Sequence, residues 1–319
     1  MIKINVPESD FNKRLDKIIR KNLDYCPLGE IFRLFRNGKI LIDGRKCKEN
    51  DRVTETAGEI EILADENELR AKFAEKSESV NKNKFKIIYE DEKLIVCDKP
   101  AGVASQPGKN IPVGSSLIEM AKNYYPAAQP LHRIDADTSG LILIAKDVEF
   151  LRALQKIWDS DSVKKEYLAI CQGVFDKKSG KIELNLQKDG LKMSVVEKGE
   201  ENLSRLSRSR YKVISQNQHC ALVAVEIETG RMHQIRAQFS HLQHCILGDK
   251  RYGNEFRDRE IEKVFGVKIS RLMLHSHKIS FVLGKKNYSF SSENPEFFSF
   301  VNSFRFGLVK NSILPTNGN

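Results

Sequence analysis

The N-terminal part of the chain alternates apolar and polar positions at helical spacing. Between residues 11 and 23, apolar side chains recur every three or four positions, with lysines and arginines between them, and this pattern predicts an amphipathic helix. A second helix is predicted over 28–35, ended by Asn37-Gly38. Lys39–Ile42 followed by Asp43-Gly44 predicts a short strand and a tight turn.

From residue 85 onward, the pattern changes to short apolar runs typical of strands. Four helices are predicted near 116–124, 148–158, 232–243 and 295–304. Strands outnumber these helices and do not alternate with them regularly, which predicts an α+β fold with a mostly antiparallel mixed sheet. The strands are expected at Phe85–Tyr89, Leu94–Cys97, Leu141–Ala145, Tyr167–Cys171, Ile182–Leu186, Tyr211–Ile214, Ala221–Ile227, Leu272–Leu274 and Ile279–Leu283.

These patterns divide the chain into four parts. Residues 1–63 form a small basic α/β domain, and residues 64–84 are polar with Phe73 as the only large apolar side chain, which indicates a linker. Residues 85–310 carry the larger α+β domain. Residues 311–319 are expected to be a disordered tail.

Charge is segregated along the chain, which has 319 residues and a formal net charge of +10. Residues 11–48 contain eleven Lys/Arg against four acids, whereas residues 49–68 contain eight acids and one arginine. A basic module of this kind favours a polyanionic partner. The six cysteines are scattered without a CxxC pair, and no apolar stretch is long enough to span a membrane, so we expect a cytoplasmic protein.

The stretch LHRIDADTSGLILIAKD concentrates polar residues directly before an apolar run. The run reads as a buried strand, and the residues at 137–140 are ordinary turn formers. A turn leaves His132, Arg133 and Asp135 unexplained, so this position is also a candidate site.

This stretch is one of five segments that form a pattern across the larger domain, and they are Glu92–Gly102, His132–Gly140, Lys165–Ala169, Thr229–Arg236 with Gly248-Asp249 and Tyr252-Gly253, and Arg271–His275. Together these segments resemble the RluA-type pseudouridine synthases over roughly residues 85–305. The order of elements over residues 12–63, two short basic helices followed by a small sheet, is similar to the S4 RNA-binding domain, which points to the RluC and RluD branch of that family.

The resemblance implies an enzyme that isomerises uridine to pseudouridine in RNA, without metal or other cofactor. Asp135 matches the family's catalytic aspartate, and Arg236 matches the cation that keeps it ionised. Tyr167 matches the active-site tyrosine, whose ring can stack on the base while its hydroxyl handles a proton. Leu274 is expected to form the apolar floor under the uracil. His233 and Arg236 are predicted to share one face of a helix that begins near Arg231.

RNA contacts are expected from two groups of residues. Around the site they are His132, Arg133, Thr138, Lys99, Arg231, His233 and Gln234, with Lys99 making one phosphate contact. In the basic module they are Arg14, Lys17, Arg33, Arg36 and Lys39.

The substrate that we expect is large-subunit ribosomal RNA, bound by a monomer. Two alternatives stay open at this point: a synthase that acts on transfer RNA, and a non-catalytic RNA-binding factor in ribosome assembly. The His241/His244 and His275/His277 pairs lack further ligands at suitable spacing, so we expect no metal site.

Overall fold

The structure is a computed structural model that describes residues 1–23, 26, 28–54, 58–69, 86–108, 111–190, 192–196, 204–304 and 306. The chain divides into two compact units, Met1–Phe85 with Gln106–Tyr124, and Lys86–Ser105 with Tyr125–Asn319. Most of the predicted linker, residues 70–84, and the predicted tail, residues 311–319, lie outside the described residues. No helix in the described ranges is long and apolar enough to cross a membrane.

The first unit contains a four-stranded antiparallel sheet with the order β1-β4-β2-β3. Its helices bury the apolar side chains that their spacing selects, including Leu15, Ile18 and Ile31, against Ile40 and Ile60 of the sheet. The elements are β1 (Ile2–Asn5), the 3-10 helix η1 (Glu8–Asp10), α1 (Leu15–Asn22), α2 (Leu28–Arg36), β2 (Ile40–Ile42), β3 (Arg45–Lys46), β4 (Glu59–Ile62) and α4 (Leu117–Tyr124).

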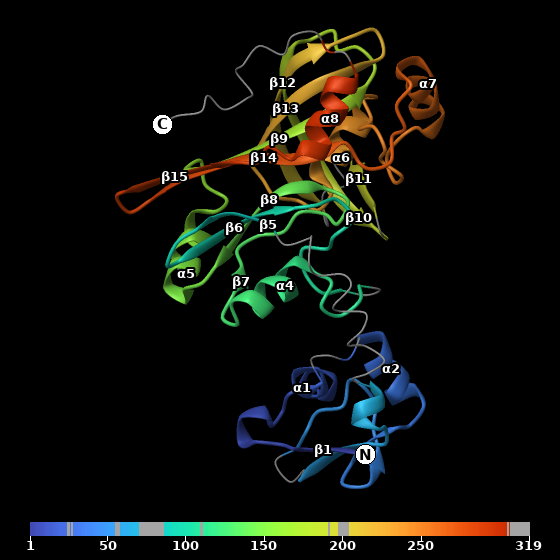
Figure 1. Cartoon of the computed structure of the whole chain (residues 1–319), viewed down its shortest axis with the longest axis vertical. Coiled ribbons are helices and arrows are strands. Elements are labelled where there is room, and N and C mark those ends of the chain that lie inside the picture. Colours follow the sequence, from blue (N-terminus) through green and yellow to red (C-terminus); the bar gives the residue numbers. More distant parts are fainter. Residues whose placement is uncertain are drawn as a thin grey trace. The chain divides into compact units, whose positions relative to one another are not determined.

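The second unit is built on an eleven-stranded sheet whose main order is β11-β10-β12-β13-β9-β14-β8-β6-β5. The strands are β5 (Lys86–Glu90), β6 (Leu94–Lys99), β7 (Gln129–Pro130), β8 (Ser139–Ala145), β9 (Val163–Gln172), β10 (Ser179–Asp189), β11 (Lys192–Val196), β12 (Arg205–Gln216), β13 (Cys220–Ile227), β14 (Leu274–Leu283) and β15 (Lys286–Ser291). The helices are α5 (Val148–Ile157), α6 (Gln234–His241), α7 (Glu255–Phe265) and α8 (Pro295–Ser303). Figure 1 shows this long sheet, with the β14–β15 hairpin projecting as an arm.

The α+β class with a mostly antiparallel sheet, expected from the sequence, is confirmed. In the part of the chain that the structure describes, every strand pair is antiparallel except β8 and β14, which run parallel and pair His275 with Ser139 and Ser276 with Gly140. Gly140 has a φ of 111°, and a Cβ atom there would lie 2.2 Å from the carbonyl oxygen of Ser276. The close approach of these two strands therefore requires glycine.

Candidate active site

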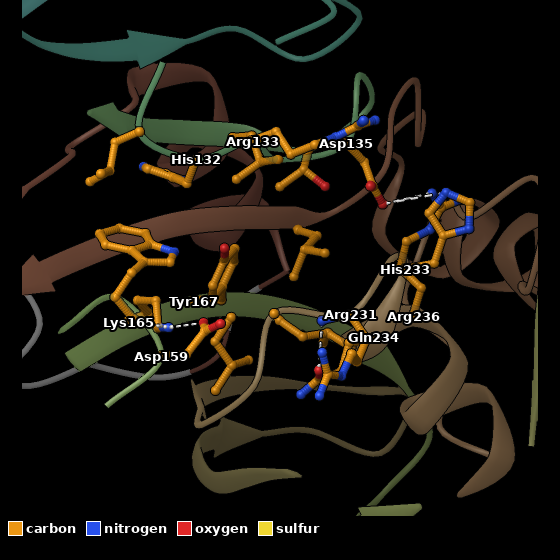
Figure 2. A pocket seen from close by; sticks show the side chains of 18 residues that line it. His132, Arg133, Asp135, Asp159, Lys165, Tyr167, Arg231, His233, Gln234 and Arg236 are labelled. Atoms are coloured by element: carbon orange, nitrogen blue, oxygen red, sulfur yellow. Dashed lines mark hydrogen bonds and ion pairs between the residues drawn. The ribbon is translucent and has the colours of Figure 1, made fainter. Parts of the chain in front are cut away.

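The second unit contains a cavity of about 310 Å³ where several of its segments converge. Its walls come from the loop before β8, the segment between α5 and β9 with β9 itself, the last residue of β13, the segment that leads into α6 with the first turn of that helix, and the first residue of β14. Figure 2 shows Asp135 with its carboxylate directed toward His233 and Arg236, and Tyr167 standing on β9. Residues separated by up to 143 positions thus line one pocket, as Leu131 and Leu274 show.

Asp135 lies on a loop that the segment after β6 holds in place. Lys99 is fully buried, and its ammonium group donates to the carbonyl oxygens of Pro100, Val103 and Ala136 at 2.9, 2.7 and 2.8 Å. Burial lowers the pKa of Lys99 to about 7. The ammonium form uses all three N–H donors inside the protein and the side chain is fully buried, so the phosphate contact predicted for Lys99 is wrong. Its role is to anchor the residue next to Asp135.

Arg236 lies between two carboxylates. Its Nε and Nη2 donate to Asp249 Oδ2 and Oδ1, both at 2.8 Å, and its Nη1 donates to Asp135 Oδ2 at 3.2 Å. Burial alone would lower the pKa of Arg236, but the hydrogen bonds and charge of Asp249, with those of Asp135, outweigh it and raise the pKa. The guanidinium is therefore a permanent cation beside the Asp135 carboxylate, whose side chain is 22% exposed.

His233 reaches the same carboxylate by a route that differs from the predicted one. Helix α6 begins at Gln234, and His233 precedes it in the left-handed conformation, with a φ of 50°. The expected shared helix face is therefore wrong, although His233 Nε2 still lies 3.7 Å from Asp135 Oδ2. Burial is the largest influence on the imidazole and lowers its pKa, so His233 is neutral at pH 7.

Tyr167 and Leu274 come from the neighbouring strands β9 and β14 and line the same cavity. Burial raises the pKa of Tyr167 to about 12, while the adjacent Ser276 hydroxyl acts in the opposite direction. The phenol is therefore protonated at neutral pH. A planar ring, an apolar side chain and a carboxylate in one pocket suit a flat, uncharged base attached to a sugar.

Comparisons with known proteins agree with this arrangement. The sequence profile described as RNA pseudouridylate synthase matches residues 93–241. The ribosomal large subunit pseudouridine synthase C of Buchnera aphidicola subsp. Schizaphis graminum (strain Sg) is 31% identical over 312 residues, which cover 94% of this chain and 96% of that protein. The protein of the same name from Vibrio cholerae serotype O1 is 31% identical over 288 residues, covering 88% of each chain.

The chain belongs to the RNA pseudouridylate synthase family. It is an RNA pseudouridine synthase, with RNA as its partner, so the resemblance drawn from its five motifs is confirmed. Among solved structures, human RNA pseudouridylate synthase domain containing 4 superposes with a TM-score of 0.59 at 22% identity, covering 73% of this chain and 96% of that chain. Human RNA pseudouridylate synthase domain containing 1 gives a TM-score of 0.56 at 19% identity, covering 68% and 85%. These likenesses concern the fold.

Several residues of the synthase that were expected to contact RNA use their polar atoms within the protein. Gln234 accepts from Thr229 Oγ1 and the Arg231 amide, and it donates to the Arg208 carbonyl and to Ser209. Its amide has no donor left for a base, so the expected contact does not fit this position. It fixes the turn into α6 instead.

His132 is half-buried and stacks on Trp158 with ring centroids 4.6 Å apart. Its Nε2 accepts from the Leu143 amide at 3.0 Å, and burial, helped by the charge of Lys165, lowers its pKa to about 3. A neutral ring cannot act as a phosphate cation, although the other ring nitrogen keeps its hydrogen. Arg133, on the cavity rim, is exposed.

Thr138 and Arg231 also line the cavity. Thr138 is buried, and its amide donates to the Asp135 carbonyl at 3.1 Å, which tightens the loop. Arg231 is half-buried and donates through Nε to the Leu206 carbonyl at 3.2 Å.

The five basic residues of the first unit that were expected to contact RNA fall into two groups. Arg14 forms two hydrogen bonds with Asp16, at 3.0 and 2.9 Å, and Arg33 pairs with Glu30. The other three side chains are exposed, and they are Lys17, Arg36 and Lys39.

Three residues of the site, or of its immediate support, stand in the quoted motifs but were given no role from the sequence. Asp249 and Tyr252 stand in the fourth motif and contact Arg236. Lys165 precedes Tyr167 by two residues and lies over the Trp158 ring at 5.1 Å, closing one end of the cavity. The signal for the first two was their place in a motif, but the motif does not say which side chain they support. The described residues contain no group of three or more His, Cys, Asp or Glu that could hold a metal ion.

Proposed function

We propose that this synthase converts uridines of large-subunit ribosomal RNA to pseudouridine, with Asp135 as the reacting carboxylate. The observation that carries the proposal is the position of Asp135 at the cavity, 3.2 Å from the Arg236 guanidinium. Relatives named ribosomal large subunit pseudouridine synthase C align along nearly the whole chain, which supports ribosomal RNA as the substrate.

The reaction is an isomerisation, and its atoms balance without a co-reactant. The bond from C1′ to N1 of uridine breaks, the uracil turns, and a bond from C1′ to C5 forms. The proton on C5 is lost, and N1 gains one. The carboxylate of Asp135 acts on the nucleotide, and the nearby positive charge of Arg236 offsets the cost of removing that carboxylate from water.

Tyr167 serves the freed base in this proposal. Its ring stacks on the uracil, and Leu274 contacts the base from another side of the cavity. The hydroxyl of Tyr167 is protonated at neutral pH, so it can donate a proton during the reaction. The base must first leave its RNA stack, which costs a few kcal/mol. The exposed guanidinium of Arg133 at the rim contacts the RNA around the vacated position.

The first unit acts as an S4-type RNA-binding module in this proposal. Two helices with basic outer faces and a small antiparallel sheet support that assignment. Lys17, Arg36 and Lys39 contact phosphates, and the protein works as a monomer.

The test uses RNA that carries tritium at C5 of uridine, because forming the new bond must release that label into water. We expect release from unmodified ribosomal RNA by the wild type and none by Asp135→Asn, while RNA affinity stays unchanged. Asp137→Asn is the matched control, since it removes an exposed carboxylate two positions away and should keep its activity.

Each other outcome would contradict a different part of the proposal. Release from transfer RNA alone would overturn the substrate, and normal turnover by Asp135→Asn would overturn the role of that carboxylate. RNA binding without release from either RNA would favour the ribosome assembly factor.

A further inference from the structure

Tyr252 stands behind the wall of the active site and touches both groups that face Asp135. Its hydroxyl lies 3.0 Å from His233 Nδ1, and its ring lies 5.3 Å from the Arg236 guanidinium carbon. Tyr252 is not one of the described residues that line the cavity. Its contacts therefore concern the groups around Asp135 rather than the substrate.

The Tyr252 hydroxyl is itself anchored by another element. The backbone N–H of Met193, on strand β11, donates to this oxygen at 2.6 Å. Burial raises the pKa of Tyr252, so the hydroxyl keeps its hydrogen at neutral pH. One lone pair of the oxygen is occupied by Met193, and the hydroxyl hydrogen is free to point to His233.

This geometry selects one tautomer of the neutral His233 ring. If Nδ1 carried the hydrogen, Nε2 would present a lone pair to the Asp135 carboxylate 3.7 Å away, and the Tyr252 hydroxyl would lose its acceptor. With the hydrogen on Nε2, Nδ1 accepts from Tyr252 and Nε2–H points to Asp135. Only the second arrangement satisfies all three groups.

The backbone of His233 supports this assignment. The residue adopts the left-handed backbone conformation, which is uncommon for residues other than glycine. Such conformations cluster at functional sites. It turns the imidazole between Tyr252 and Asp135. A distance of 3.7 Å is longer than a hydrogen bond, but contacts of this kind commonly tighten when substrate binds.

We propose that Tyr252 is a positioning residue for the reaction, which fixes His233 as a neutral Nε2–H donor to Asp135 through its hydroxyl and seats the Arg236 guanidinium with its ring. This inference rests on the proposed function of Asp135. It gives the reacting carboxylate two donors of different kinds, one cationic and one neutral. Both are aligned by a residue that does not touch the substrate.

The first measurement is the ring nitrogen NMR spectrum of His233 in the free full-length protein at neutral pH, assigned with a His233→Gln variant. We expect a protonated Nε2 and an unprotonated Nδ1 in the wild type. In Tyr252→Phe, which keeps the ring and removes only the hydroxyl, the proton should redistribute toward Nδ1. A wild-type proton on Nδ1, or an unchanged distribution in Tyr252→Phe, would overturn the proposal.

The second measurement is single-turnover tritium release with ribosomal RNA. Tyr252→Phe should lower the rate at saturating RNA by about fivefold, the kinetic equivalent of one hydrogen bond, with an unchanged RNA concentration at half-saturation. Tyr89→Phe is the matched control, because it also removes a hydrogen-bonded hydroxyl. Tyr89 lies on strand β5, and its hydroxyl donates to Asp91 at 2.8 Å. The Tyr89→Phe variant should release tritium at the rate of the wild type.

The two measurements separate this inference from the function on which it rests. An unchanged rate in Tyr252→Phe, or a change confined to the half-saturating RNA concentration, would overturn the positioning role. Absence of turnover in the wild type would instead refute the proposed function, and the nitrogen spectrum would still decide whether Tyr252 places the His233 proton.

Discussion

Replacing Asp249 with asparagine tests whether the Arg236 guanidinium is held by a second carboxylate. Asp249 is buried and accepts four hydrogen bonds, two from Arg236 and one each from the amides of Arg251 and Tyr252. In Asp249→Asn, the remaining oxygen can keep the Oδ1 contacts. The new NH2 group then replaces Oδ2 and faces the Nε–H of Arg236. Both groups are donors, so the charge-assisted hydrogen bond between Arg236 Nε and Asp249 Oδ2 is lost.

The expected loss of stability follows from that single contact. A hydrogen bond to a charged group contributes roughly 1.5–3 kcal/mol. Removing one partner of a buried ion pair costs about 3–5 kcal/mol, and the Asp135 carboxylate that remains beside Arg236 places this case below that range. We therefore expect the free energy of unfolding of the second unit to fall by about 2–3 kcal/mol.

Urea unfolding followed by tryptophan fluorescence measures this change, because the only tryptophan of the chain, Trp158, lies in the second unit. With a urea dependence of about 1–3 kcal/mol per molar, the midpoint should move down by about 1 M. Tritium release should also slow, because Arg236 loses the support that directs it to Asp135.

Asp258→Asn is the matched control, because Asp258 is a half-buried acid that also accepts side-chain and backbone hydrogen bonds, from Gln172 and from the Gly248 amide. Burial raises the pKa of Asp258, whereas for Asp249 the opposing effect of Arg236 outweighs burial and lowers the pKa. Asp258→Asn should therefore lower the free energy of unfolding by less than Asp249→Asn does. Equal midpoint shifts in the two variants would refute the reasoning.

The pH dependence provides a second check on Asp249. Because its folded pKa lies below the unfolded value of 3.8, its carboxylate contributes stability above pH 3.8, and this contribution is lost as the pH falls through the folded pKa. The difference in stability between the wild type and Asp249→Asn should stay constant from neutral pH down to about pH 5 and narrow below 3.8. A gap that does not narrow in acid would assign the loss to packing rather than charge.

Two further predictions concern the sheet and the basic module. Gly140→Ala should lower the free energy of unfolding of the second unit by more than about 3 kcal/mol, because the added Cβ would strike the backbone of β14. Gly284→Ala is its control, since Gly284 also has a positive φ but has open space around it, and this change should cost only about 1–2 kcal/mol in the same urea assay. Replacing Lys17, Arg36 and Lys39 together with glutamine should reduce the slope of log affinity against log salt by about 2 for single-stranded RNA, and an unchanged slope would exclude them from the RNA interface.

Local periodicity was enough to find most of the helices of both units, but not all of them. The predicted helices over 148–158 and 295–304 are observed as α5 and α8, because each has a clear apolar face and a side chain that caps its first turn, Asp147 and Asn294. Helix α7 was missed. Of the sequence EFRDREIEKVF, only Ile261 is buried, so the segment has almost no apolar face to detect.

The strands at the edges of the eleven-stranded sheet were harder to find than the central ones. Strands β8 and β9 have continuous apolar runs because both of their faces are covered. Strand β11 and strand β15 alternate polar and apolar residues with many exposed positions, and their pairing partners decide their conformation. That information is not local to the segment.

The side-chain roles that the sequence assigned wrongly are those decided by contacts across the fold. Lys99 follows a buried strand, and nothing local indicates that its ammonium group meets a carbonyl 37 positions away. Gln234 stands in a motif with charged residues, yet its amide is consumed by the turn that it stabilises. Asp135, Arg236 and Tyr167 converge as expected, because a resemblance to a family transfers their spatial arrangement along with their identity.

The arrangement around Arg236 also explains why the cation at this place is an arginine. Its Nε and Nη2 hydrogens form one edge of the guanidinium, and Asp249 accepts both. The Nη1 group projects from the other end and reaches Asp135. A lysine ammonium, as a compact point charge on a flexible stem, cannot present two parallel donors to one carboxylate and a third, fixed donor to another. Because Asp249 holds one edge of the planar guanidinium, the Nη1 group at its other end is held in a fixed place beside the carboxylate of Asp135.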